Sequence, residues 1–284
     1  MPKSRSNRKS HRLAVSFHKS FVPERRLIHA MLEFAASGGA GDVHAISAAT
    51  GIPTGSSSGK VAPILDYCRG MGLLTLSSGR SAVKAPCLTP FGRAVLLDDP
   101  FLKSELTQWL AHVHLCDELN GAEVWYQTFW MGMARLGASF GRDELDAWLE
   151  SACRKRQRSI IGPLLSMYQD EGAWGLCGAV KADGTRLVRR PMPVRSEFAW
   201  GYAAWILSAI DKIGRAREQI TVDELNDACG WRRLSGWTPE EAERSLWLAE
   251  CKGAIAVDRH MHPWIIRGTV TAPDAWRRLY SDMI

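Results

Sequence analysis

The sequence lacks any pair of cysteines at the spacing that metal sites use. Its seven cysteines lie far apart, at positions 68, 87, 116, 153, 177, 229 and 251, and no C-x-x-C motif occurs. This absence excludes a zinc ribbon, and the odd number argues against a disulfide framework. Free thiols are typical of a reducing compartment, so we expect a cytoplasmic protein.

Long hydrophobic runs are also missing. The longest apolar stretch, residues 198–210, is shorter than the roughly 20 residues that a membrane-spanning helix needs. The apolar stretch from Leu13 to Val15 is too short for the core of a signal peptide. We therefore expect a soluble chain without a membrane partner.

Acidic residues are absent from the first twelve positions, which hold five cations, Lys3, Arg5, Arg8, Lys9 and Arg12. The whole chain carries 36 Lys and Arg against 30 Asp and Glu, a formal net charge of +6. A basic block at a chain end often forms an arm on nucleic acid, because its cations neutralise phosphates and release counterions. Arg5, Arg8, Lys9 and Arg12 are therefore candidate DNA contacts.

Helical periodicity dominates what is present, and 46% of the residues are hydrophobic, enough for a core. Apolar residues at helical spacing predict helices over 23–36, 43–50 and 59–71. Two short strands, 73–76 and 83–88, follow on either side of a Ser- and Gly-rich turn. Three helices followed by a β-hairpin is the order of a winged helix-turn-helix.

The last part of the chain repeats this plan. Helices are predicted over 198–215 and 221–228, and Thr238-Pro239 opens another with a cap and a proline at its first position. Residues 255–257 and 264–267 form a second predicted hairpin. The predicted fold class is mainly α, with an N-terminal winged helix-turn-helix, a central helical region and a second winged-helix-like unit at the C-terminus.

These patterns divide the chain into five parts. They are a basic tail (1–12), a winged helix-turn-helix domain (13–99), a helical middle region (100–170), a Gly-, Pro- and Arg-rich linker or loop (171–197) and a second winged-helix-like domain (198–284).

The start of the helix over 59–71 is the best candidate for DNA recognition. Serine hydroxyls and free N–H groups at a helix N-terminus contact phosphates well. This places Ser57, Ser58 and Lys60 at the duplex, with Tyr67 and Arg69 facing the groove from the outer side of the helix. The alternative is a helix that only packs, with its serines as caps. Arg80 and Lys84 on the predicted wing are candidate contacts to the flanking backbone.

Other motifs fail on spacing or context. The segment from Gly55 to Lys60 has one residue too few for a P-loop, and Val61 stands where Ser or Thr is required. The third helix of the C-terminal unit is rich in glutamate, which favours a structural or protein-binding role, although Arg232, Arg233 and Arg244 lie nearby. No arrangement of ligands predicts a metal site.

Several segments, taken in order, resemble a bacterial family known as domain of unknown function number four thousand and seven, which accompanies DNA phosphorothioation and phage-defence gene clusters. The resemblance covers most of the chain. It rests on His18-Lys19-Ser20-Phe21, Gly51-Ile52-Pro53, Ser58-Gly59-Lys60-Val61-Ala62-Pro63-Ile64, Leu88-Thr89-Pro90-Phe91-Gly92, Trp109-Leu110-Ala111-His112 and Trp125-Tyr126. In function the chain is most similar to the B component of the Ssp system.

That resemblance implies a DNA-nicking endonuclease that opens one strand of double-stranded DNA for sulfur incorporation, together with a cysteine desulfurase, an ATPase and an ATP-pyrophosphatase-like partner. A nicking reaction would call for Mg²⁺. His18 and Glu24 are the candidate catalytic residues, but Lys19 replaces the glutamate that usually follows the family's histidine. A non-catalytic DNA-binding adaptor and a winged-helix transcriptional regulator remain as alternatives.

Overall fold

The structure is a computed structural model that describes residues 10–55, 59–76, 82–154, 160–213 and 219–283. It is mainly helical, as predicted, and its strands form small sheets of two or three. Within the described ranges, no helix combines the length and the apolar character that crossing a bilayer requires.

The first unit, residues 25–88, has the predicted order of three helices and a hairpin. The N-cap Asp42 accepts hydrogen bonds from two backbone N–H groups of the second helix. Gly41 forms an antiparallel bridge with Lys84, just before the second strand of the hairpin begins. The second strand therefore lies between Gly41 and the first strand. The elements are α1 (Arg25–Ala36), α2 (Val43–Thr50), α3 (Val61–Gly70), β1 (Leu74–Leu76) and β2 (Pro86–Leu88).

The unit at the C-terminal end, residues 199–268, repeats this plan, again as predicted. We call it the third unit, because another unit lies between the two in the chain. Thr221 and Thr238 cap successive helices in reciprocal capping boxes with Glu224 and Glu241. The sheet order β6-β8-β7 places the last strand in the middle. The elements are α10 (Ala199–Ile213), β6 (Gln219–Thr221), α11 (Val222–Cys229), α12 (Trp231–Ser235), α13 (Pro239–Cys251), β7 (Ile255–Asp258) and β8 (Ile265–Gly268).

A second unit, residues 123–189, lies where we expected only helices and a linker. Its sheet order, β3-β5-β4, again places the last strand in the middle. The two-residue loop Gly184-Thr185, with Gly184 at a φ of +57°, closes the hairpin inside the supposed linker. The elements are α6 (Glu123–Trp125), the π-helix η1 (Tyr126–Met131), α7 (Met133–Leu136), β3 (Ser139–Gly141), α8 (Arg142–Cys153), α9 (Ile161–Gln169), β4 (Val180–Asp183) and β5 (Arg186–Arg189).

Sequence traces of the repeat become visible once the units are aligned by their elements. Helix α3 begins Val-Ala-Pro-Ile-Leu and α9 begins Ile-Gly-Pro-Leu-Leu, each with proline third, where a missing N–H costs no helical bond. Helices α8 and α11 share Asp-Glu-Leu in their first turn. Ile46, Leu145 and Leu225 occupy the same fourth position of their helices, and all are fully buried.

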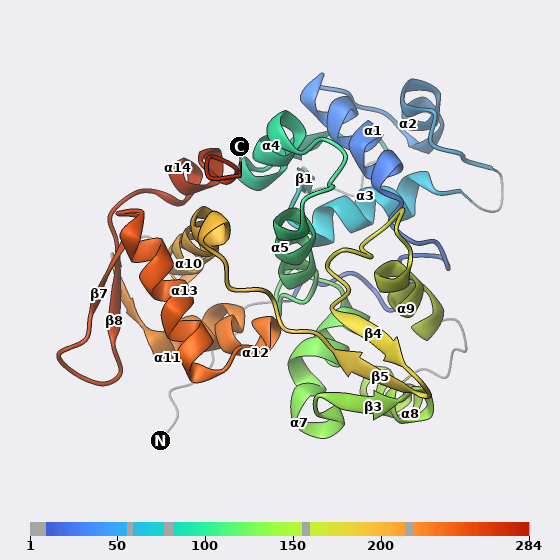
Figure 1. Cartoon of the computed structure of the whole chain (residues 1–284). Helices are drawn as coiled ribbons and strands as arrows, with labels where there is room; N and C mark the ends of the chain where they lie inside the picture. Colours follow the sequence, from blue (N-terminus) through green and yellow to red (C-terminus); the bar gives the residue numbers. More distant parts are fainter. Residues whose placement is uncertain (1–9, 56–58, 77–81, 155–159, 214–218, 284) are drawn as a thin grey trace.

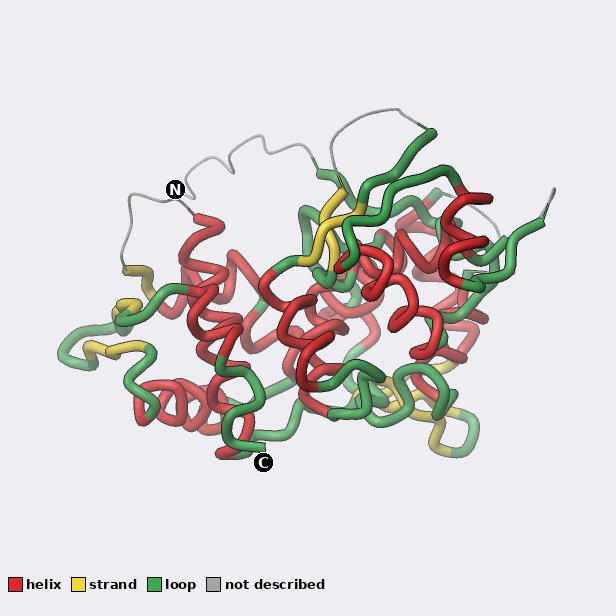
Figure 2. Tube along the Cα trace, turned by 90° about the horizontal axis from the view of Figure 1, so that it is seen from above, coloured by secondary structure: helices red, strands yellow, loops and turns green. Residues whose placement is uncertain are grey.

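The three units surround helix α5 (Figure 1). Seen from above, the strands form three separate groups with helices filling the space between them (Figure 2). Helix α4, which follows the first unit in the chain, contacts α14 near the C-terminus. Helix α14 in turn packs on α10. The connecting elements are α4 (Pro90–Asp98), α5 (Glu105–Leu115), the 3₁₀ helix η2 (Ser196–Phe198) and α14 (Ala272–Arg277).

Helix α3 is buried on both sides, which corrects one expectation. Seven of its ten residues are buried. Tyr67, expected to face a DNA groove, is fully buried and donates a hydrogen bond from its hydroxyl to the carbonyl of Phe21 at 3.1 Å. The N-terminal segment covers this side, because the Phe17 ring meets the Tyr67 ring edge-on at 4.8 Å and Leu13 packs on Gly70.

The burial of Tyr67 predicts a large loss of stability on truncation. Tyr67→Ala should lower the free energy of unfolding by about 3–5 kcal/mol, because it leaves a cavity in the core. Tyr67→Phe, which loses only the hydroxyl, should cost about 1 kcal/mol. Urea denaturation measures both, with Leu97→Ala as the control, since Leu97 on α4 is 73% exposed. If the Tyr67→Ala variant is as stable as the wild type, the side chain of Tyr67 is not buried in the core.

Candidate nucleic-acid interface

Lys60, the cation predicted at the start of α3, is paired with an acid. Its Nζ forms an ion pair with the Glu24 carboxylate and lies 5.5 Å from the centre of the Phe21 ring. Burial acts to raise the pKa of Glu24, but the hydrogen bonds and charges of Lys60 and Arg26 outweigh it and hold that pKa below its usual value. Glu24 is therefore an ionised partner of two cations in this structure.

Arg69 and Arg12 fasten the N-terminal segment to the fold. Arg69 lies 3.7 Å from a carboxylate oxygen of Asp66 and donates to the carbonyl of His11 at 3.5 Å. Arg12, predicted on a flexible tail, pairs with Glu123 at 2.6 Å and stacks over the Tyr126 ring at 4.1 Å. Both guanidinium groups hold protein partners.

Of the remaining predicted DNA contacts, one lies within the described residues and the others lie outside them. Lys84 pairs through its backbone with Gly41, at N–O distances of 2.8 and 3.0 Å, and so lies on the hairpin as predicted. The other predicted DNA contacts lie outside the described residues. They are Arg5, Arg8, Lys9, Ser57, Ser58 and Arg80.

His18, the other catalytic candidate, is a buried side chain at a strained turn. The next two residues, Lys19 and Ser20, have φ angles of +46° and +66°, a region that side chains other than glycine rarely adopt. The His18 Nδ1 accepts a hydrogen bond from the Ser20 N–H at 3.0 Å, which fixes the turn. Burial lowers the pKa of His18 to about 4, although a backbone contact with Val15 opposes it.

The described residues do not assemble a magnesium site. No group of three or more His, Cys, Asp or Glu side chains lies close enough together, within the described ranges, to hold a metal ion. No hydrogen bond or ion pair joins His18 to Glu24 among these residues. Because Mg²⁺ binds mainly to carboxylate and other oxygen ligands, we derive no metal-dependent cleavage step from these side chains.

A buried polar network joins the second unit to α5. The Tyr168 hydroxyl contacts His112 Nδ1 at 2.6 Å and accepts a hydrogen bond from Trp125 Nε1 at 3.1 Å. Burial, with a smaller contribution from the positive charge of Arg189, lowers the pKa of His112 to about 3. The imidazole is therefore neutral at physiological pH, and the network has a structural rather than an acid–base character.

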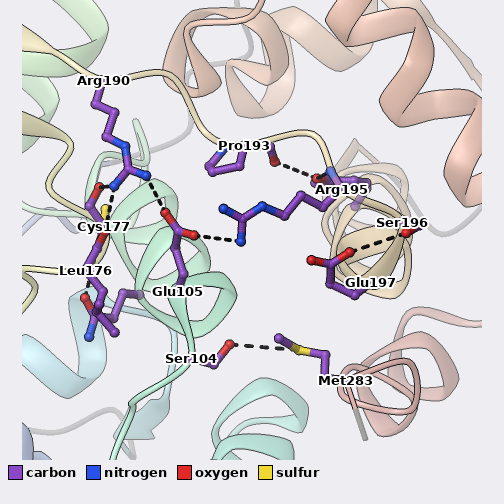
Figure 3. Close-up of polar contacts among 12 residues, drawn as sticks. Ser104, Glu105, Leu176, Cys177, Arg190, Pro193, Arg195, Ser196, Glu197 and Met283 are labelled. Atoms are coloured by element: carbon purple, nitrogen blue, oxygen red, sulfur yellow. Dashed lines mark hydrogen bonds and ion pairs between the residues drawn. The ribbon is translucent and has the colours of Figure 1, made fainter.

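The segment predicted as a linker is fixed to α5 by ion pairs. Figure 3 shows Glu105 between two guanidinium groups, 2.8 Å from Arg190 and 3.1 Å from Arg195. Glu105 stands in the first turn of α5, where the helix dipole also favours a negative charge. A hydrogen bond from the Tyr202 hydroxyl to the carbonyl of Pro193, at 2.7 Å, holds the middle of the segment.

Arg189 differs from Arg190, the next residue in the chain. In the part of the chain that the structure describes, no carboxylate pairs with Arg189. Its Nε donates to the carbonyl of Gly137 at 2.9 Å and its Nη2 to the carbonyl of Thr128 at 2.7 Å. The guanidinium lies between the rings of Phe129 and Phe140, at 5.2 and 5.0 Å. Burial lowers the pKa of Arg189 to about 10, so the group stays charged at an energetic cost.

A cleft of about 470 Å³ separates the hairpin of the first unit from the third unit. Arg69, His114 and Lys212 contribute polar groups to its lining, and Trp205 and Trp276 contribute aromatic ones. This volume falls within the range of about 300–1,000 Å³ that small-molecule sites occupy. No local pattern in the sequence predicts the cleft, because residues as far apart as Arg69 and Trp276 line it together.

The depressed histidine pKa values predict acid sensitivity. His18 has a pKa of about 4 in the folded protein and about 6.5 when unfolded, so only the unfolded chain gains a proton between these values. The free energy of unfolding should therefore be constant above about pH 6.5 and fall toward pH 4. His18→Asn keeps an acceptor for the Ser20 N–H and should flatten the slope by up to about 1.4 kcal/mol per pH unit. Urea denaturation across this range measures the slope, and an unchanged slope would contradict the assignment.

Comparison with known proteins gives structural matches. No protein-family model matches the sequence, and no curated protein matches it. A crystal structure of magnesium ion-bound SspB superposes with a TM-score of 0.68 at 16% identity, covering 95% of this chain and 88% of that one. A second SspB crystal structure gives a TM-score of 0.63 at the same identity and coverage. The chain therefore shares the fold of SspB across nearly its whole length.

Proposed function

We propose that this protein is a DNA-binding component of a phosphorothioate-modification and phage-defence system. The observation that carries the proposal is a topology repeated in three units: a helix, a strand or β-bridge, at least two further helices and a hairpin. In the second and third units the last strand lies in the middle of a three-stranded sheet, and in the first unit the bridge between Gly41 and Lys84 adjoins a two-stranded hairpin. We identify these units as winged-helix-like modules. The shared fold with SspB and the sequence resemblance to the phosphorothioation family support the same role.

The proposed contacts are to the phosphate backbone rather than to base edges. Helix α3 leaves only Ala62, Asp66 and Arg69 partly exposed. The last helix of the third unit, α13, exposes Glu240 and Glu243 beside Arg244 and Trp247. Carboxylates on that face would repel phosphates, which favours a protein-facing role for α13. The formal charge of +6 favours association with a polyanion as a whole.

Lys60 and Arg69 remain the proposed phosphate contacts on the first unit. Their side chains are 26% and 32% exposed, and each is paired with one carboxylate. Ion pairs at such partly exposed positions contribute about 0–1 kcal/mol, so a polyanion with several phosphates can displace the carboxylate. Lys84 on the hairpin lies on the same unit.

Fluorescence anisotropy with a labelled duplex tests these contacts. The double variant Lys60→Ala/Arg69→Ala should weaken binding and make the log–log salt slope shallower by about 1.8, because each phosphate contact contributes about 0.9. Arg277→Ala is the matched control, since Arg277 also pairs with an acid and is 74% exposed on α14. Unchanged affinity and slope in the double variant would remove both residues from the interface.

Strand nicking is a second candidate function, favoured by the magnesium-bound state of one SspB structure with this fold. On this hypothesis the protein converts supercoiled plasmid to the open circular form in Mg²⁺ and not in EDTA. Gel electrophoresis over a time course measures the conversion. If plasmid binds but stays supercoiled with Mg²⁺ present, the protein acts as a non-catalytic adaptor.

A further inference from the structure

A cavity of about 200 Å³ lies where α5, the second unit and the third unit meet. The lining residues that carry charge or polar hydrogen are Trp109 and His112 from α5, Arg189 and Arg190 from the end of β5, and Arg233 from α12. None of the described residues that line the cavity is an aspartate or a glutamate. The polar part of the wall is therefore cationic and rich in donors, whereas most of the remaining lining is apolar.

Two of these donors have no protein acceptor. Trp109 is fully buried, and its indole Nε1–H makes no hydrogen bond in the described part of the chain. The Nη1 of Arg189 is also buried and unpartnered there. A buried donor without an acceptor costs about 1–3 kcal/mol, and more when it is charged. Both donors belong to residues that line the cavity, so a ligand rich in acceptors could supply the partners that the protein does not.

Two of the three arginine charges at the cavity, those of Arg189 and Arg233, are also uncompensated among the described residues. Arg190 shares Glu105 with Arg195, but that carboxylate belongs to α5 outside the cavity wall. Arg233 is exposed beside the cavity, and its guanidinium lies 5.5 Å from the centre of the Trp130 ring, with no ion pair among the described residues. An anion in the cavity would reach Arg189 and Arg233 together and would supply the missing negative charge.

We propose that this cavity binds a phosphate-class oxyanion, which rests on the proposed function where the oxyanion is a phosphodiester group of the DNA backbone. A volume of about 200 Å³ equals about seven water molecules, enough for one tetrahedral oxyanion with part of its hydration shell. It is below the range of about 300–1,000 Å³ of sites for larger ligands. Indole N–H and guanidinium donors suit tetrahedral oxyanions, because both groups offer directed N–H bonds.

Isothermal titration calorimetry with inorganic phosphate and with sulfate, at constant ionic strength set by chloride, tests the cavity itself. Arg233→Gln should weaken phosphate binding roughly tenfold, because it removes one charge-assisted contact. Trp109→Phe, which removes the N–H together with part of the indole ring, should weaken it several-fold. Arg232→Gln is the matched control, since it removes the same charge from the neighbouring exposed position, which does not line the cavity.

Circular dichroism melting checks that each variant is folded. Arg233 is exposed, so Arg233→Gln keeps the test valid even if Trp109→Phe unfolds. Wild-type protein that binds neither phosphate nor sulfate above the chloride background would overturn the proposal, as would equal affinities in Arg233→Gln and Arg232→Gln.

Anisotropy with a duplex distinguishes the two sources of the oxyanion. If the cavity holds a backbone phosphate, Arg233→Gln should weaken DNA binding more than Arg232→Gln, and inorganic phosphate should compete beyond its ionic strength. Phosphate binding with equal DNA affinities in both variants identifies free oxyanion as the ligand and upholds the cavity. If the protein binds phosphate but no DNA, the proposed function is wrong and the cavity proposal still stands.

Discussion

The architecture depends on one shared burial, that of the third helices of the first two units against Trp125. Its ring meets the Tyr67 ring of α3 edge-on at 5.9 Å, and its Nε1 donates to the Tyr168 hydroxyl of α9 at 3.1 Å. A unit of about 65 residues buries too little apolar surface to be more than marginally stable alone. Packing two such helices on one indole gives both units a common core.

On the proposed function, this burial limits how the protein could contact DNA. In a free winged helix, the third helix is the part that enters the major groove. Here α3 lies under the N-terminal segment, and six of the nine residues of α9 are buried. Helix α13 keeps an outward face, and that face is acidic. If the units are winged-helix-like, as we propose, two of these helices serve as packing surfaces, and the proposed contacts are therefore to the phosphate backbone.

The fold of the two outer units could be predicted from local signals. Capping threonines at 221 and 238, each with glutamate three residues on, mark helix starts whatever their surroundings. The middle unit was missed because β3 has three residues and β4–β5 lies in an arginine-rich stretch. Asp183-Gly184 between alternating residues was the signal for that hairpin.

The candidate site was less accessible to prediction than the fold. Periodicity assigns α3 one apolar stripe, but it carries no information on whether a distant segment covers the opposite side, as residues near Phe17 do to Tyr67. The chain likewise gives no sign that Lys60 meets Glu24, or that Arg189 is partly buried while Arg186 is exposed. These outcomes depend on which units pack together, and that is decided by contacts between residues far apart in the chain.

Arg189 and Arg190 are neighbours in sequence with opposite electrostatic surroundings. Glu105 neutralises Arg190, whereas Arg189 has carbonyl acceptors and aromatic rings around it and a donor left over. An acid on the cavity wall would compensate Arg189 and raise stability, but it would also repel any phosphate that approached. Functional sites commonly keep such unfavourable arrangements because the ligand supplies what the fold omits. On this proposal, the junction of α5 with the second and third units is less stable than it could be at the place where an anion would complete it.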